Sequence, residues 1–132
     1  MRKVVLIVDD EFIILESLRI QLERFLPVEV SVESAHSGEE AIDLLKGFKE
    51  EELDPLVVIS DFNLGDAKGT DILKQVKDLF PSAKRVLLSG QAGSDAEIEE
   101  FSRDFGLDLF LSKPWDLSEL RQNTEAFIAG KY

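Results

Sequence analysis

Residues 3–11 read KVVLIVDDE, an apolar run that ends abruptly in three acidic side chains. From Lys3 to Val8 the run is rich in β-branched residues and shows no alternation of polar and apolar positions. This composition is typical of a strand that is buried on both faces of a parallel sheet. We therefore expect a central strand over these residues, with Asp9, Asp10 and Glu11 at its carboxyl end.

Similar short runs recur along the chain, at Val28–Val32, Leu56–Ile59, Arg85–Leu88 and Leu107–Leu111. The intervals between them have apolar residues at helical spacing, as in the first interval with Ile14, Leu18, Leu22 and Phe25. Three pairs of residues have the pattern of a helix start, in which a cap residue is followed three positions later by a glutamate: Ser37 with Glu40, Ser94 with Glu97, and Asp116 with Glu119. Alternating strands and helices predict a βα repeat.

Five such units in 132 residues predict a single α/β domain over residues 1–132. Right-handed crossovers would give a doubly wound, flavodoxin-like (βα)5 three-layer sandwich with a parallel sheet in strand order 2-1-3-4-5. In open sheets of this kind, ligands bind in a crevice beyond the carboxyl ends of the strands. Functional side chains are therefore expected at that edge.

The composition excludes several classes of function. The chain has 15 basic and 27 acidic side chains and a formal charge of −12, so it would repel the phosphate backbone of a nucleic acid, and we expect no direct nucleic-acid binding. It has no cysteine, which excludes disulfides, thiolate metal sites and a cysteine nucleophile. Its longest apolar run is far shorter than the ~20 residues that span a bilayer, and the first residues do not resemble a secretory signal. These features predict a cytoplasmic protein that does not bind membranes.

Polar residues follow four of the predicted strands: Asp9 and Asp10, then Asp61, Ser89 and Lys113. The first and third strands are neighbours in the predicted order, so Asp61 should lie beside Asp9 and Asp10. Three clustered carboxylates repel one another unless their pKa values rise or a cation joins them. An all-oxygen site suits Mg²⁺. Taken singly, each residue could be a helix cap, a loop residue or a surface residue, but their shared edge favours a common site.

Four segments resemble the receiver domains of two-component response regulators: Val8-Asp9-Asp10-Glu11, Ser60-Asp61-Phe62-Asn63, Leu87-Leu88-Ser89-Gly90 and Lys113-Pro114. Gly69, eight residues after Asp61, matches the same pattern. The resemblance covers essentially the whole chain. It implies phosphorelay signalling in which Asp61 accepts a phosphoryl group from a sensor histidine kinase or a histidine phosphotransfer protein.

The resemblance also implies a downstream effector protein or output domain, and it allows a homodimer that forms on phosphorylation. The chain would be a signalling phosphoacceptor rather than an enzyme, catalysing only its own phosphotransfer and slow autodephosphorylation. By the same resemblance, Asp10 and Asp61 would bind Mg²⁺ directly, with Mn²⁺ as an alternative ion. Asp9 would bind it largely through water and Asn63 through its backbone carbonyl. No organic cofactor is implied.

Other roles follow from the same resemblance. Ser89 and Lys113 would engage the phosphoryl oxygens. Ser89 and Phe110 would form a switch that alters the surface of the fourth helix, fifth strand and fifth helix. Asn63 and Gln91 occupy positions that tune dephosphorylation. His36, the only histidine, precedes a predicted helix cap and is expected away from the active edge.

The chain departs from the family pattern in places. Many receivers have a hydrophobic-proline pair where this chain has Leu64-Gly65, and a further hydrophobic residue at the position of Ala67. Because glycine widens the accessible range of backbone dihedrals, we expect a more flexible loop. Serine replaces the commoner threonine at position 89, and Phe110 lacks the hydroxyl of the usual tyrosine, so the strength of the switch stays open.

Three other functions are alternatives for a fold of this kind. A flavodoxin-like cofactor module would have to cradle a phosphate in its first loop, where three adjacent acidic residues would repel it. A haloacid-dehalogenase-like phosphatase carries an Asp-x-Asp motif after its first strand, whereas Asp9 and Asp10 are adjacent here. The third alternative is a degenerate receiver that acts as a protein-interaction scaffold without phosphorylation, because a fold alone does not establish function.

Overall fold

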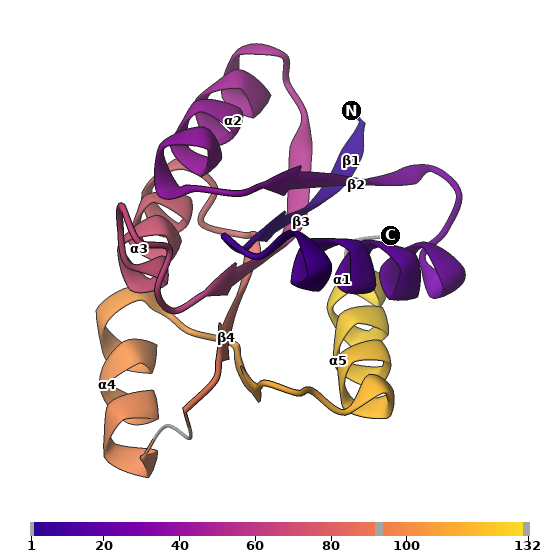
Figure 1. Cartoon of the computed structure of the whole chain (residues 1–132). Coiled ribbons are helices and arrows are strands. Elements are labelled where there is room, and N and C mark those ends of the chain that lie inside the picture. The colour runs from indigo at the N-terminus through magenta and orange to yellow at the C-terminus, as the bar shows by residue number, and fades with distance from the viewer. Residues whose placement is uncertain (1, 92–93, 131–132) are drawn as a thin grey trace.

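The computed structural model describes residues 2–91 and 94–130 (Figure 1). At its centre lies a five-stranded parallel sheet in the order β2-β1-β3-β4-β5. The strands are β1 (Lys3–Val8), β2 (Val30–Ala35), β3 (Asp54–Asp61), β4 (Lys84–Ser89) and β5 (Leu109–Ser112). The predicted fold class and strand order are confirmed.

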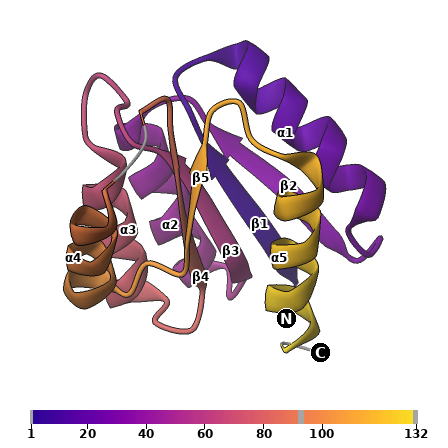
Figure 2. The same ribbon diagram turned by 90° about the horizontal axis from the view of Figure 1, so that it is seen from below.

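Five helices alternate with the strands and cover both faces of the sheet. They are α1 (Phe12–Phe25), α2 (Gly38–Glu50), α3 (Gly69–Leu79), α4 (Asp95–Phe105) and α5 (Leu117–Ala129). In Figure 2, α1 and α5 lie on one face, and α2, α3 and α4 lie on the other. The result is the expected three-layer sandwich.

The central strand β1 contributes to two hydrophobic cores. Val4 and Leu6 point into the core beneath α2, α3 and α4, whereas Val5 and Ile7 point into the core beneath α1 and α5. All four side chains are fully buried. Burial on both faces is why the sequence of this strand shows no polar alternation.

The predicted bounds of β2 were wrong. The strand begins at Val30, and Val28, which we had expected inside it, is 99% exposed. Val28 lies in a turn that is closed by a hydrogen bond from the Val30 N–H to the Pro27 carbonyl (3.0 Å). From Val30 to Ala35 the strand pairs residue by residue with β1. Pairing with β1, rather than local hydrophobicity, therefore sets its limits.

This shift also changes the place of His36, which directly follows β2 and so lies at the carboxyl edge of the sheet. The expectation that His36 would lie away from that edge is wrong. Its Nδ1 lies 3.2 Å from Glu40 Oε2, and its ring makes an edge contact with Phe12. The residue is therefore engaged by the starts of α1 and α2.

The predicted helix starts are confirmed. Ser37, Ser94 and Asp116 each accept a hydrogen bond from the backbone N–H three residues later. At Ser94 the Glu97 carboxylate also accepts a hydrogen bond from the Ser94 N–H, which completes a capping box. At Ser37, by contrast, the Glu40 carboxylate pairs with His36.

Candidate functional site

Three carboxylates meet at the carboxyl edge of the sheet. Oxygens of Asp9, Asp10 and Asp61 lie within 4.8 Å of one another. The pairing of β1 with β3 brings them together, because Val8 is in register with Ser60, one residue before each of Asp9 and Asp61. Asp9 is fully buried, Asp61 is 8% exposed and Asp10 faces solvent. The cluster thus has a closed inner side and an open outer side.

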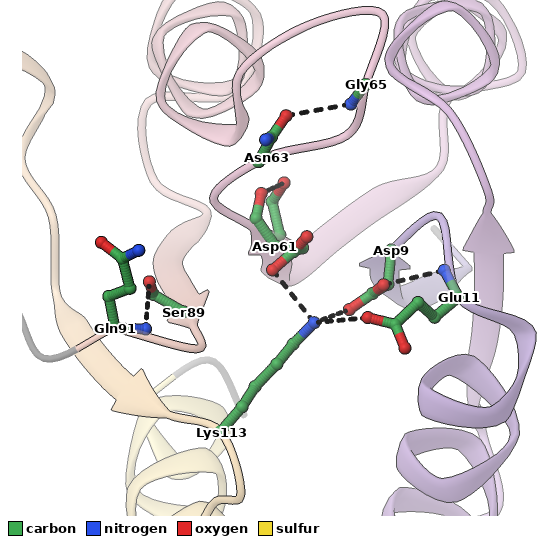
Figure 3. Close-up of polar contacts among 9 residues, drawn as sticks. Asp9, Glu11, Asp61, Asn63, Gly65, Ser89, Gln91 and Lys113 are labelled. Atoms are coloured by element: carbon green, nitrogen blue, oxygen red, sulfur yellow. Dashed lines mark hydrogen bonds and ion pairs between the residues drawn. The ribbon is translucent and has the colours of Figure 1, made fainter.

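Lys113 joins this cluster from the loop after β5 (Figure 3). Its Nζ lies 2.7 Å from Asp9 Oδ2 and 3.1 Å from Asp61 Oδ1. A third carboxylate, Glu11, lies 3.8 Å from the same nitrogen. The Lys113 N–H donates to the Ser89 carbonyl (2.7 Å), which holds the start of this loop against β4. One ammonium group thus partly neutralises the carboxylates.

The surroundings shift the titration of both Asp61 and Lys113. Burial raises the pKa of Asp61 above its ordinary value of 3.8; the hydrogen bond from Lys113 opposes this rise, and the negative charge of Asp9 adds to it. For Lys113, burial by itself lowers the pKa, but the hydrogen bonds to Asp9 and Asp61 outweigh it and the pKa is raised. Lys113 is therefore a positive charge throughout the neutral range.

We predict that Lys113→Met raises the pKa of Asp61 further, because the variant loses the hydrogen bond and the positive charge that oppose the effect of burial. The carboxyl ¹³C shift of Asp61, followed by NMR against pH without added metal, measures it. A group whose pKa is raised by folding binds protons more tightly in the folded state. The contribution of Asp61 to the free energy of unfolding therefore falls as the pH rises from its ordinary pKa through its raised pKa in the folded state.

The matched control is Lys84→Met, which removes a lysine whose Nζ lies 3.9 Å from Asp108, away from the cluster. It should leave the titration of Asp61 unchanged. An Asp61 midpoint that does not move in Lys113→Met would contradict the assigned role of the lysine.

The donor chemistry of the cluster fits a hard divalent cation. Its three carboxylates supply only oxygen ligands, and the one ammonium group leaves an excess of negative charge. Asp10 is exposed, so the outer side of the cluster is open to an ion and its water. These residues could therefore hold a metal.

A tight turn follows Asp61. Asn63 Oδ1 accepts a hydrogen bond from the Gly65 N–H (3.1 Å), and the Leu64 N–H donates to the Ala67 carbonyl (3.0 Å). Gly65 has φ +84°, a backbone conformation that favours glycine. The greater flexibility that we expected here stays a prediction, but the structure shows that hydrogen bonds close this segment.

Gly69 is placed where no side chain fits. Its N–H donates to the Phe62 carbonyl (2.7 Å), which draws the start of α3 against the end of β3. A Cβ at this position would overlap the carbonyl oxygen of Asp61 and lie 2.9 Å from Ser60 Oγ. The glycine therefore allows α3 to begin directly against the backbone of Asp61.

The other predicted residues line a cavity of about 420 Å³ that includes Asp61. Ser89, Gln91 and Phe110 all contribute to its wall, as do Lys113 and Asn63. Ser89 Oγ accepts a hydrogen bond from the Gln91 N–H (3.2 Å), and Phe110 is partly buried. Every residue that the sequence marked for the site thus lies in the acidic cluster or around this cavity.

Comparison with known proteins identifies the family of this site. The family model of the response regulator receiver domain matches residues 5–125, which is most of the chain. The chain belongs to this family. It is a receiver domain of the two-component regulatory systems, as the sequence motifs predicted.

Curated relatives of this receiver domain include longer proteins. It is 30% identical over 113 residues to the DNA-binding transcriptional regulator NtrC of Proteus hauseri, covering 86% of the chain and 22% of the regulator. It is 27% identical over 124 residues to the cell cycle response regulator CtrA of Brucella ovis, covering 94% of the chain and 49% of CtrA. The chain therefore spans about half or less of these relatives.

Solved receiver domains have the same fold. A response regulator receiver domain protein from Clostridium thermocellum superposes with a TM-score of 0.80 at 27% identity, covering 99% of this chain and 97% of that one. A CheY-like receiver domain protein from Methanospirillum hungatei gives a TM-score of 0.79 at 27% identity, covering 99% and 98%. In the described part of this receiver domain, none of the helices has the length and apolar content needed to cross a membrane.

One contact of the receiver domain was not foreseen. Asp66, in the loop between β3 and α3, accepts hydrogen bonds from the N–H groups of Gly38 and Glu39 at the start of α2. These bonds hold the pKa of Asp66 below its ordinary value of 3.8. The partners are 28 and 27 residues apart, so no local pattern could have indicated them.

Proposed function

We propose that this receiver domain accepts a phosphoryl group on Asp61 from the phosphohistidine of a sensor histidine kinase or a histidine phosphotransfer protein. The observation that carries the proposal is the position of Asp61 Oδ1, 3.1 Å from Lys113 Nζ. The same carboxylate lies in the acidic cluster and on the wall of the cavity. An oxygen nucleophile, a fixed cation and room for a phosphoryl group are thus combined.

Mg²⁺ is the proposed metal, and Mn²⁺ would use the same oxygen ligands. Asp10 and Asp61 would hold the ion directly, Asp9 largely through water, and Asn63 through its backbone carbonyl. When bound, the ion neutralises negative charge on the transferring oxygens. The exposed carboxylate of Asp10 and the adjoining cavity support access of both the ion and the donor.

In the proposed reaction, a carboxylate oxygen of Asp61 attacks the phosphorus of the phosphohistidine in line with the P–N bond. A P–O bond forms, the P–N bond breaks with its electron pair left on the imidazole nitrogen, and that nitrogen takes up a proton from solvent. The product is an acyl phosphate. Lys113 stabilises negative charge on the phosphoryl oxygens, and it needs no reorganisation because Asp9 already holds it in place.

Ser89 and Phe110 would carry the response to phosphorylation. The Ser89 oxygen accepts a bond from Gln91, which leaves its hydroxyl proton available to a phosphoryl oxygen. Movement of Ser89 toward that group would open space for Phe110, which borders the same cavity. The surface of α4, β5 and α5 would change as a result.

The remaining parts of the proposal concern turnover and partners. The domain would catalyse only its own phosphotransfer and a slow autodephosphorylation, tuned by the uncharged residues Asn63 and Gln91. Its target would be an effector protein or an output domain, in the cytoplasm, and phosphorylation would favour a homodimer. Relatives such as CtrA are about twice the length that this chain covers, which supports an output partner. Labelling with acetyl phosphate and Mg²⁺, followed by intact mass, tests whether the domain accepts a phosphoryl group.

Asp10→Asn is predicted to weaken Mg²⁺ binding at least about tenfold. Even substitution of residues that only hydrogen-bond to a metal ligand lowers metal affinity by about tenfold or more. Isothermal titration calorimetry on the unphosphorylated chain measures the affinity. Asp78→Asn, which removes an exposed carboxylate from α3, is the control and should bind Mg²⁺ like the natural sequence. Equal affinities in the two variants would remove Asp10 from the proposed metal site.

A further inference from the structure

We propose that Asp66 is a positioning residue for the metal site. Its carboxylate would anchor the β3–α3 loop, residues 62–68, to the start of α2 and thereby hold Asn63 and Gly65 beside the acidic cluster. The link to metal binding rests on the proposed function, whereas the anchoring itself does not.

Two residues, Asp66 and Ser37, accept hydrogen bonds from the N–H groups at the start of α2. The Gly38 N–H donates to Asp66 Oδ1 (2.9 Å) and the Glu39 N–H donates to Asp66 Oδ2 (3.0 Å). The Glu40 N–H donates to Ser37 Oγ (3.1 Å), and the Ala41 N–H donates to the Ser37 carbonyl (3.1 Å). A helix leaves its first N–H groups without internal partners. The Ala41 bond is already the first i→i−4 bond of the helix. Of the three N–H groups before it, Ser37 Oγ satisfies that of Glu40, and Asp66 in the loop satisfies those of Gly38 and Glu39.

A close backbone approach accompanies these bonds. A Cβ built on Gly38 would lie only 2.6 Å from the Cβ of Ala67 and 3.2 Å from Asp66 Oδ1. The absence of a side chain at Gly38 therefore lets the loop pack directly on the helix start. The loop is held both by the carboxylate and by this contact.

The other end of the loop lies over the metal site. Leu64 is 3% exposed and belongs to the core beneath α2 and α3. Asn63 Oδ1 accepts a hydrogen bond from the Gly65 N–H, and a Cβ on Gly65 would lie 3.9 Å from Asp10 Oδ2. Only two residues separate Asp66 from Asn63, and the hydrogen bond from the Leu64 N–H to the Ala67 carbonyl closes this turn. Release of Asp66 should therefore displace the Asn63 carbonyl.

The test compares two variants that each remove a cap from the same helix. Asp66→Ala removes the cap that the loop provides, and Ser37→Ala removes the local cap. If the caps only stabilise α2, both variants should lower the melting temperature and neither should change Mg²⁺ affinity. We expect instead that Asp66→Ala alone weakens Mg²⁺ binding, by about tenfold as for residues that orient a ligand. Asp66→Asn, which keeps one acceptor oxygen, should be intermediate.

Hydrogen exchange without metal gives an independent measurement. The Leu64 and Gly65 amides should exchange faster in Asp66→Ala, and at the natural rate in Ser37→Ala. Unchanged exchange in Asp66→Ala, or Mg²⁺ affinity equal to that of the natural sequence, would overturn the role of Asp66. A natural chain that binds no Mg²⁺ would instead contradict the proposed function, and the exchange rates would still decide whether Asp66 anchors the loop.

Discussion

Asp61→Asn is expected to abolish labelling of the receiver domain by acetyl phosphate and Mg²⁺. The amide has nearly the shape of the carboxylate but lacks the anionic oxygen that attacks phosphorus. The natural sequence should gain one phosphoryl group by intact mass, and the variant should gain none. Because Asp61 is the only proposed acceptor, the expected loss is complete rather than partial.

A control at the opposite end of the same strand is Asp54→Asn. Asp54 begins β3, far from the carboxyl edge, and its N–H bonds to the Arg2 carbonyl. This variant should be labelled to the natural extent. Labelling that persists in Asp61→Asn would place the acceptor elsewhere. A natural chain that takes no label from acetyl phosphate would favour the scaffold alternative.

Among the glycines that the structure describes, Gly69 is the one where substitution by alanine is expected to lower the stability most. The added Cβ would overlap the Asp61 carbonyl oxygen and crowd Ser60 Oγ, so α3 would have to move away from β3. Overpacking of this kind costs about 1–3 kcal/mol. A domain of this size loses roughly 4 °C in melting temperature per kcal/mol. Calorimetry should therefore show a fall of several degrees, and labelling at Asp61 should drop because its backbone is displaced.

Gly47→Ala is the matched control. Gly47 lies inside α2, and a Cβ there meets nothing within 4 Å. Alanine in a helix interior is favoured over glycine by about 0.5–1 kcal/mol, so this variant should melt slightly higher than the natural sequence. If Gly69→Ala melted at the natural temperature, the contact between α3 and the Asp61 backbone would not restrict this position.

The acidic cluster could be predicted because it depends on general rules. The end of a buried strand can be recognised at Asp9, and a parallel βα repeat places the carboxyl ends of β1 and β3 side by side. Adjacent pairing, with Val8 opposite Ser60, then brings Asp61 to the same place. The predicted start of β2 was wrong because it depends on a contact with another strand. Val28 is as apolar as a strand residue, but the pairing of β2 with β1 begins only at Val30, opposite Lys3.

Periodicity and strand-end position, both readable along the chain, were enough to predict the α/β class and the acidic edge, and the flavodoxin-like doubly wound topology supplied the strand order. Only the tertiary structure shows that Lys113 reaches both Asp9 and Asp61, that Gly69 packs against the Asp61 backbone, and that Asp66 caps α2. These contacts join residues that belong to different βα units or to loops. Their distances depend on how the helices and loops pack on the sheet, and no repeating pattern in the sequence records that packing.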